Sequence, residues 1–220
     1  MNYQAVVFDM DGVIFDSEIK VVECWRVIAD KYDIPDIDDA VRECFGCNQV
    51  EAKERFLKRY GADFPYVEYK KEMSDLFHER YDNGKLPLKP GVVEIMDYLK
   101  ACGKKIALAT STRQVTVESG LTWAGLIDYF DAIICGDMVE RSKPAPDIYI
   151  KACEVLDVSP SEAYAIEDSY NGIRSAHAAG LMPIMVPDMM EPNEEMEELS
   201  VGIIESLDMV VEYIKKSTDS

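Results

Sequence analysis

Residues 5–12 read AVVFDMDG, four apolar side chains followed by Asp9, Met10, Asp11 and Gly12. An uninterrupted apolar run of this length is typical of a strand buried on both faces of a parallel sheet. In open α/β sheets, ligands bind outside the carboxyl ends of the strands. This stretch therefore predicts both a central strand and, directly after it, an acidic functional site.

Further apolar runs of strand length follow a linker that contains Pro87 and Gly91. Strands are predicted at 105–109, 132–135, 163–166 and 182–186, and helices at 92–101, 113–120, 147–156 and 170–179. Regular alternation of strands and helices predicts an α/β fold, a doubly wound parallel sheet with helices on both faces.

Residues 18–81 follow a helical period instead, with Val21, Trp25 and Ile28 on one face. Breaks at Pro35, Gly46, Gly61 and Pro65 divide this segment into about four helices. We therefore expect a core domain made of residues 1–15 and 85–220, and an all-helical domain, residues 16–84, inserted after the first strand.

The composition is that of an ordinary globular protein, with 48% apolar and 30% charged residues. Its 23 basic and 42 acidic residues give a net charge of −19, and the stretch Glu191–Glu198 is expected to be solvated. Such a charge disfavours nucleic acid and anionic lipid, whose affinity comes from Lys and Arg. No apolar run approaches the ~20 residues of a membrane helix, and the first residues do not resemble a signal peptide. We expect a cytoplasmic monomer that binds a small molecule, with no nucleic acid or membrane partner.

Cysteine and histidine do not indicate a metal site. Cys44 and Cys47 form a single CxxC with no second pair, and His78 and His177 lie far apart in the sequence. We expect reduced structural thiols and assign any metal binding to carboxylates.

Polar residues follow each of the first four predicted strands. The first strand is followed by Asp9, Asp11 and Gly12, the second by Thr110, Ser111 and Thr112, the third by a loop with Lys143, and the fourth by Glu167 and Asp168. One such cluster alone is common at a strand end. Their joint occurrence places carboxylates, hydroxyls and one ammonium group at one edge of the sheet.

This set suits phosphoryl transfer. Asp9 can attack phosphorus and form an aspartyl-phosphate, and Asp11 can exchange protons with the leaving oxygen and with water. Asp9 and Asp168, with Glu167, supply the oxygen ligands that Mg²⁺ prefers.

Two further groups would bind the phosphoryl oxygens. The Lys143 ammonium and the Thr110 hydroxyl can stabilise their charge in the transition state. Gly12 suits a backbone that passes close to the phosphate.

Four segments resemble the motifs of one known family, the haloacid dehalogenase-like hydrolases. Residues 8–13 (FDMDGV) resemble its first motif, 107–111 (ALATS) the second, 142–147 (SKPAPD) the third and 166–169 (IEDS) the fourth. These motifs occur in the family's order and the match spans essentially the whole chain.

The resemblance implies a nucleophile at Asp9, an acid–base at Asp11, and Mg²⁺ held by Asp9, the backbone carbonyl of Asp11, Glu167 and Asp168. True dehalogenases of the family lack the second aspartate, so Asp11 argues against dehalogenation. The inserted helices resemble the family's small helical cap, with its hinge at residues 16–18.

Within the family the chain most resembles β-phosphoglucomutase and related sugar-phosphate phosphatases. A mutase histidine and a mutase arginine of the cap fall at Val21 and near Gln49, so neither residue type is present. Residues 112–114 do resemble the mutase segment that binds the distal phosphate. We expect substrate contacts at Gly12, Gln49, Ser111, Thr112, Arg113 and Gln114. The sequence predicts a Mg²⁺-dependent phosphatase for a small phosphomonoester such as a sugar phosphate, with a phosphoglucomutase as the alternative.

Three other classes explain less of the sequence. A receiver domain has its phospho-acceptor on a later strand and no inserted helices. A glycosyltransferase DxD motif leaves Lys143, Glu167 and Asp168 without a role. A non-catalytic protein that binds a phosphorylated ligand on this fold would be expected to lack a catalytic acid, and none is missing.

Overall fold

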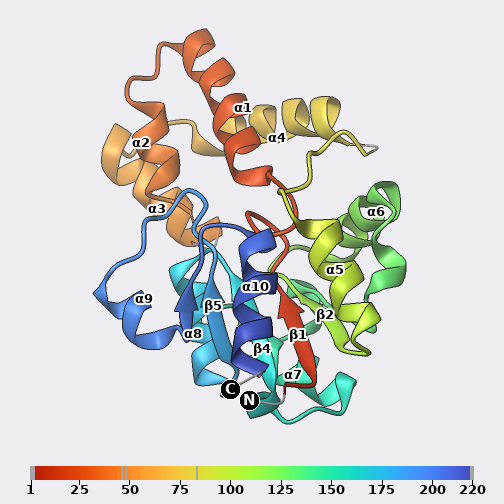
Figure 1. Cartoon of the computed structure of the whole chain (residues 1–220). Coiled ribbons are helices and arrows are strands. Elements are labelled where there is room, and N and C mark those ends of the chain that lie inside the picture. Colours follow the sequence, from red (N-terminus) through yellow and green to blue (C-terminus); the bar gives the residue numbers. More distant parts are fainter. Residues whose placement is uncertain (1–2, 46, 48, 83, 219–220) are drawn as a thin grey trace.

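A six-stranded parallel sheet forms the centre of the larger part of the molecule (Figure 1). The computed structural model describes residues 3–45, 47, 49–82 and 84–218. The strands are β1 (Ala5–Phe8), β2 (Lys105–Ala109), β3 (Ala132–Ile134), β4 (Ala163–Glu167), β5 (Met182–Met185) and β6 (Gly202–Ile203). They lie in the order β3-β2-β1-β4-β5-β6, and every paired strand is parallel to its neighbour. The predicted fold class is therefore confirmed.

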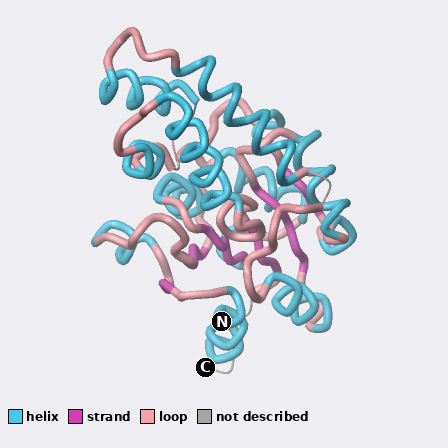
Figure 2. Tube along the Cα trace, turned by 90° about the horizontal axis from the view of Figure 1, so that it is seen from above, coloured by secondary structure: helices cyan, strands magenta, loops and turns pink. Residues whose placement is uncertain are grey.

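Helices cover both faces of the sheet, as the view from above shows (Figure 2). On one face, Val6 and Phe8 of β1 pack in a core with α5 (Val92–Ala101), α6 (Gln114–Ala124) and α10 (Leu207–Thr218). On the other face, Ala5 and Val7 pack with α7 (Asp147–Leu156), and α8 (Tyr170–Ala178) contributes Ala176. Alternate side chains of β1 thus enter two different cores, which explains why the whole strand is apolar.

The described residues of the inserted segment form four helices, α1 (Ser17–Tyr32), α2 (Ile37–Arg42), α3 (Gln49–Tyr60) and α4 (Tyr66–Tyr81). They share a separate core in which the rings of Trp25 and Phe56 stack with centroids 5.0 Å apart. In Figure 1 these helices lie beyond the end of the sheet toward which the arrow of β1 points. The insertion therefore faces the carboxyl ends of the strands.

Two chain segments join the helices to the sheet, and they are hydrogen-bonded to each other. Asp16 N donates to Pro87 O at 2.9 Å, and Lys89 N donates to Ile14 O at 2.8 Å. Phe15 and Leu88 form an antiparallel bridge between these hydrogen bonds. The entry and the exit of the inserted segment are thus held side by side.

The structure differs from the sequence prediction at several places. Helix α6 runs through Gly120 to Ala124, because Leu121 is buried in the same core as the rest of the helix. The stretch Glu191–Glu198 is solvated only in part, since Met196 is fully buried within α9 (Glu194–Leu199). Strand β6 and helix α10 had no counterpart in the predicted elements. None of the described helices has both the length and the apolar character required to cross a bilayer.

Candidate active site

The order of the strands brings the predicted site residues to one edge of the sheet. Strand β1 lies between β2 and β4, with Phe8 opposite both Leu108 and Ile166. The residues that follow these strands, among them Asp9, are therefore neighbours in space although they are far apart in the sequence.

Lys143 lies at the centre of this group. Its Nζ atom donates to Asp9 Oδ1 at 2.6 Å, to Glu167 Oε1 at 2.6 Å and to the carbonyl oxygen of Ala109 at 2.9 Å. Only 7% of the side chain is exposed. Charge-assisted hydrogen bonds of this length are among the stronger contacts in a protein. Lys143 therefore holds the ends of β1, β2 and β4 together.

Glu167 has both carboxylate oxygens engaged by the protein. Oε1 also accepts a hydrogen bond from the Tyr149 hydroxyl at 2.8 Å, and Oε2 accepts from the Ser169 amide and hydroxyl at 3.3 and 3.1 Å. A Cβ atom added at Gly172 would lie 1.9 Å from the carboxyl carbon, so only glycine fits there. These contacts fix the position of Glu167.

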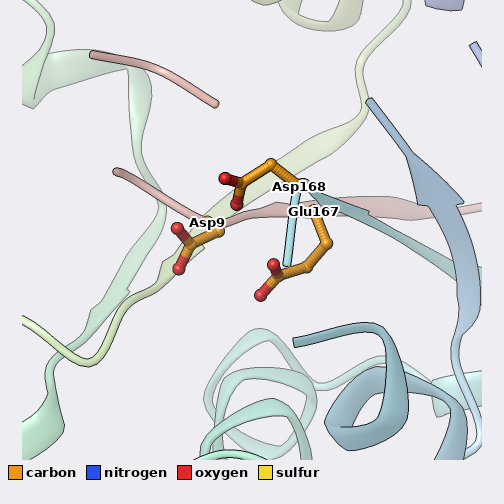
Figure 3. Close-up of side chains that lie close together, drawn as sticks. All are labelled: Asp9, Glu167 and Asp168. Atoms are coloured by element: carbon orange, nitrogen blue, oxygen red, sulfur yellow. The ribbon is translucent and has the colours of Figure 1, made fainter. Parts of the chain in front are cut away.

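Asp168 is the opposite case. It is 2% exposed, and its Oδ2 atom has no hydrogen-bond partner. Gly12 leaves space for this oxygen, since a Cβ atom there would lie 2.2 Å from it. Figure 3 shows Asp168 next to Glu167 at the end of β4, with Asp9 across from both, and one oxygen of each lies within 4.8 Å of the others. A buried carboxylate oxygen without a donor suits a cation, so this group of acids can hold a metal ion.

Asp11 is held from both sides of the site. Its Oδ1 atom accepts a hydrogen bond from the Ser17 hydroxyl, and Oδ2 accepts one from the Thr112 hydroxyl, each at 2.8 Å. Ser17 is the first residue of α1, and Thr112 follows β2. The orientation of this carboxylate therefore depends on the inserted helices as well as on the sheet.

Burial of several acids raises their pKa values. Burial is the largest cause for Asp9, whose pKa rises to about 7 although Lys143 acts to lower it. Burial and the charge of Asp188 raise the pKa of Glu18 to about 9, and burial and Glu18 raise that of Asp168. Burial would lower the pKa of Lys143, but Asp9 and Glu167 outweigh it and hold the pKa above its ordinary value. Among the described residues, Lys143 is the one lysine or arginine hydrogen-bonded to Asp9 or Glu167. Lys89 pairs with Asp188. In the described part of the chain Glu18 and Asp168 have no such partner, so the site favours a further cation.

A cavity of about 360 Å³ opens above these residues. The predicted site residues that line it are Asp9, Asp11, Gln49, Thr110, Ser111, Thr112, Lys143 and Asp168. Glu167 lies below its surface, fully buried. Arg113 and Gln114 are exposed and do not line it, and the Gln114 side chain donates to Glu118 at 2.7 Å. Substrate contacts at Arg113 and Gln114 stay a prediction.

The family model of the haloacid dehalogenase-like hydrolases matches this sequence over residues 6–186. The chain belongs to this family. Its sequence is 34% identical to a phosphorylated carbohydrates phosphatase of Thermotoga maritima over 178 residues, 81% of this chain and 82% of the relative. It is 33% identical to a β-phosphoglucomutase of Bacillus subtilis over 191 residues, 83% of each chain.

Solved structures agree with this assignment. The crystal structure of CbbY from Rhodobacter sphaeroides in complex with phosphate has a TM-score of 0.75 and 29% identity, covering 94% of this chain and 96% of that one. The family predicted from the four motifs is thereby confirmed, and with it the prediction that the protein is a hydrolase.

Three residues next to the site of this hydrolase were not among the catalytic, binding or metal residues predicted from the sequence. Tyr149 lies within α7 and gave no signal, because a buried aromatic residue on a helix is ordinarily core. Asp188 lies three residues after the end of β5, so a search for polar residues after the fifth strand would have found it. Glu18 was assigned only to the hinge, but one of its oxygens lies within 4.8 Å of those of Asp168 and Asp188.

We predict that the hydrolase loses stability with rising pH when divalent cations are removed. A carboxyl group with a raised pKa binds its proton more tightly in the folded than in the unfolded protein. Its contribution to stability is therefore present below the unfolded pKa and lost as the pH rises through the folded one. The window runs from 3.8 to about 7 for Asp9 and from 4.5 to about 9 for Glu18. Urea unfolding in EDTA at about pH 5, 7 and 9 measures the change.

Glu18→Gln and Glu68→Gln form a matched pair for this experiment, since both remove one negative charge and Glu68 is exposed on α4. The profile of Glu18→Gln should be flatter than that of the parent, and Glu68→Gln should follow the parent. Equal profiles for both variants would contradict the role given to the buried acids.

Proposed function

We propose that the protein is a Mg²⁺-dependent phosphatase that hydrolyses a small phosphomonoester, a sugar phosphate, through a phosphorylated Asp9. One observation carries the proposal: the Asp9 carboxylate lies 2.6 Å from the Lys143 ammonium and faces a polar cavity beside the unpartnered oxygen of Asp168. A nucleophile, a phosphate-binding cation and a metal ligand are thus adjacent.

In the first step a carboxylate oxygen of Asp9 attacks phosphorus, and the bond from phosphorus to the ester oxygen breaks. Asp11 gives its proton to the leaving oxygen. In the second step Asp11 takes a proton from a water molecule, whose oxygen attacks the phosphorus, and phosphate leaves Asp9. The hydrogen bonds from Ser17 and Thr112 orient the Asp11 carboxylate for both transfers.

The remaining polar groups stabilise charge. Lys143 and the Thr110 hydroxyl bind phosphoryl oxygens in the transition state. Asp9, Asp168 and the Asp11 backbone carbonyl would hold Mg²⁺, which when bound supplies positive charge that allows a carboxylate to approach an anionic phosphate. Because both oxygens of Glu167 are already hydrogen-bonded, we assign Glu167 the role of positioning Lys143 rather than direct binding of the metal.

We assign residues 16–84 to a cap domain and residues 1–15 with 85–220 to the catalytic core. Ser17 of α1 contacts Asp11, and Gln49 at the start of α3 lines the same cavity as Asp9. Closure of such a cap domain over the site excludes water from the reacting groups. Cytoplasmic location and a monomeric state stay predictions from the sequence.

Two similarities favour a sugar phosphate as the substrate. The Thermotoga maritima relative is named a phosphorylated carbohydrates phosphatase. A mutant form of CbbY, 28% identical to this chain, has been solved with xylulose-(1,5)bisphosphate. The sugar itself would lie on the cap side of the cavity, next to Asp11.

Asp9→Asn should abolish phosphate release without unfolding the protein. The amide has nearly the same shape but is a far poorer nucleophile, so we expect a loss of at least about 1000-fold in kcat. Phosphate release from p-nitrophenyl phosphate and sugar phosphates, with Mg²⁺, measures it.

Asp75→Asn is the matched control, because Asp75 is exposed on α4 and pairs only with Lys71 among the described residues. It should keep the parent's activity. An Asp9→Asn protein that retains about a tenth of the activity would remove Asp9 as the nucleophile.

A phosphoglucomutase is the second candidate, because the Bacillus subtilis relative carries that name. The positions where a mutase has its cap histidine and arginine are occupied by Val21 and Gln49, which line the cavities here. Neither side chain can exchange protons as an imidazole does or carry the positive charge with which a guanidinium binds phosphate. With β-glucose 1-phosphate and a bisphosphate activator, we therefore expect phosphate release to exceed glucose 6-phosphate formation. Faster isomerisation than phosphate release would make the mutase the correct function.

A further inference from the structure

A second, larger cavity adjoins the site on the side of the inserted helices. Its volume is about 720 Å³, within the range of small-molecule pockets. It is lined from α1, α4, α6 and the loop before α3, and it shares Asp11, Glu18, Cys47 and Thr112 with the smaller cavity. The two cavities are therefore adjacent, and the leaving group of a phosphomonoester bound at Asp9 would extend toward the larger one.

Helix α4 supplies one long wall of this larger cavity. Lys70, Met73, Phe77 and Tyr81 line it at successive turns of the helix. With a rise of 1.5 Å per residue, Lys70 lies about 16 Å along the helix axis from Tyr81. The wall thus has an ammonium group near one end and the side chains of Met73, Phe77 and Tyr81 along its length, with the polar groups of Ser74 and His78 beside them.

Lys70 differs from the other lysines of α1 and α4. Lys20, Lys31 and Lys71 pair with Glu23, Glu72 and Asp75, respectively. Lys70, in contrast, has no hydrogen bond or ion pair to any residue that the structure describes.

The acids that line the cavity with Lys70 are Asp11, Glu18 and Asp82, and among the described residues none of them forms a hydrogen bond or ion pair with it. Asp11 accepts hydrogen bonds from Ser17 and Thr112, and Asp82 contacts His78 at 3.0 Å. Lys70 is half-buried, and burial lowers its pKa. A cation that is withdrawn from water without a counter-charge costs free energy. The chain has a net charge of −19, so carboxylates are plentiful, yet none of those described pairs with Lys70. The unpaired ammonium is therefore available to a ligand.

We propose that Lys70 binds a second anionic group, a carboxylate or a phosphate, on the leaving group of the substrate. Lys70 is then a specificity-determining residue that selects phosphomonoesters with a carbon skeleton between two anionic ends. The inference rests on the proposed function, because that function places the first phosphate at Asp9. It assigns the second charge to α4, not to the start of α3, where Gln49 is uncharged.

Binding to an inactive protein tests this without turnover. In the Asp9→Asn background, calorimetry compares fructose 1,6-bisphosphate with fructose 6-phosphate, and 6-phosphogluconate with glucose 6-phosphate. We expect at least one doubly anionic probe to bind about tenfold or more tightly than its partner. The pair that shows the gain distinguishes a phosphate from a carboxylate.

Lys70→Met should remove that gain and Lys70→Arg should keep most of it. Lys71→Met is the matched control, since Lys71 follows Lys70 directly in the same helix, is exposed and pairs with Asp75. It should leave the gain intact. No gain in either pair, or a gain that survives Lys70→Met, would overturn the proposal. Failure of the phosphatase function would instead show as absent turnover of p-nitrophenyl phosphate by the parent protein.

Discussion

The contact on which the site depends is that of one ammonium group with two carboxylates from adjacent strands. Lys143 Nζ lies 2.6 Å from both Asp9 and Glu167, almost completely removed from water. Without it, the ends of β1 and β4 would place like charges next to each other in a medium of low dielectric, which strongly favours protonation or separation. Lys143 offsets part of that repulsion, and the unpartnered oxygen of Asp168 marks where further positive charge is required.

The fold and the chemistry are linked through the position of the inserted helices. Asp11 comes from the sheet edge, but one of its two hydrogen bonds comes from Ser17 at the start of α1. The entry and exit segments of the insertion are paired through Asp16 and Pro87, so a movement of the helices reaches Asp11 directly. The group that we propose transfers protons is thereby in contact with the same helices that we assign to the cap.

The sequence predicted the residues whose positions follow from topology alone. Asp9, Thr110 and Asp168 directly follow strands, so a parallel sheet is enough to bring them together. The strand order also placed Lys143 at this edge, but its loop does not determine that the ammonium group lies between Asp9 and Glu167. The contacts of Glu18 and Tyr149 depend on how helices α1 and α7 pack on the sheet, which no local pattern encodes. The same holds for β6, a strand of two residues that pairs with β5.

The central claim is that Asp9 carries the phosphoryl group and Asp11 moves the protons. Asp11→Asn separates the two steps, because p-nitrophenolate leaves without a proton whereas water still needs a base. Rapid mixing of this variant with p-nitrophenyl phosphate should give a burst of about one nitrophenolate per site, followed by slow turnover. Peptide mapping of the quenched protein should locate the phosphate on Asp9. Uniformly slow release without a burst, and no phosphorylated Asp9, would contradict the account.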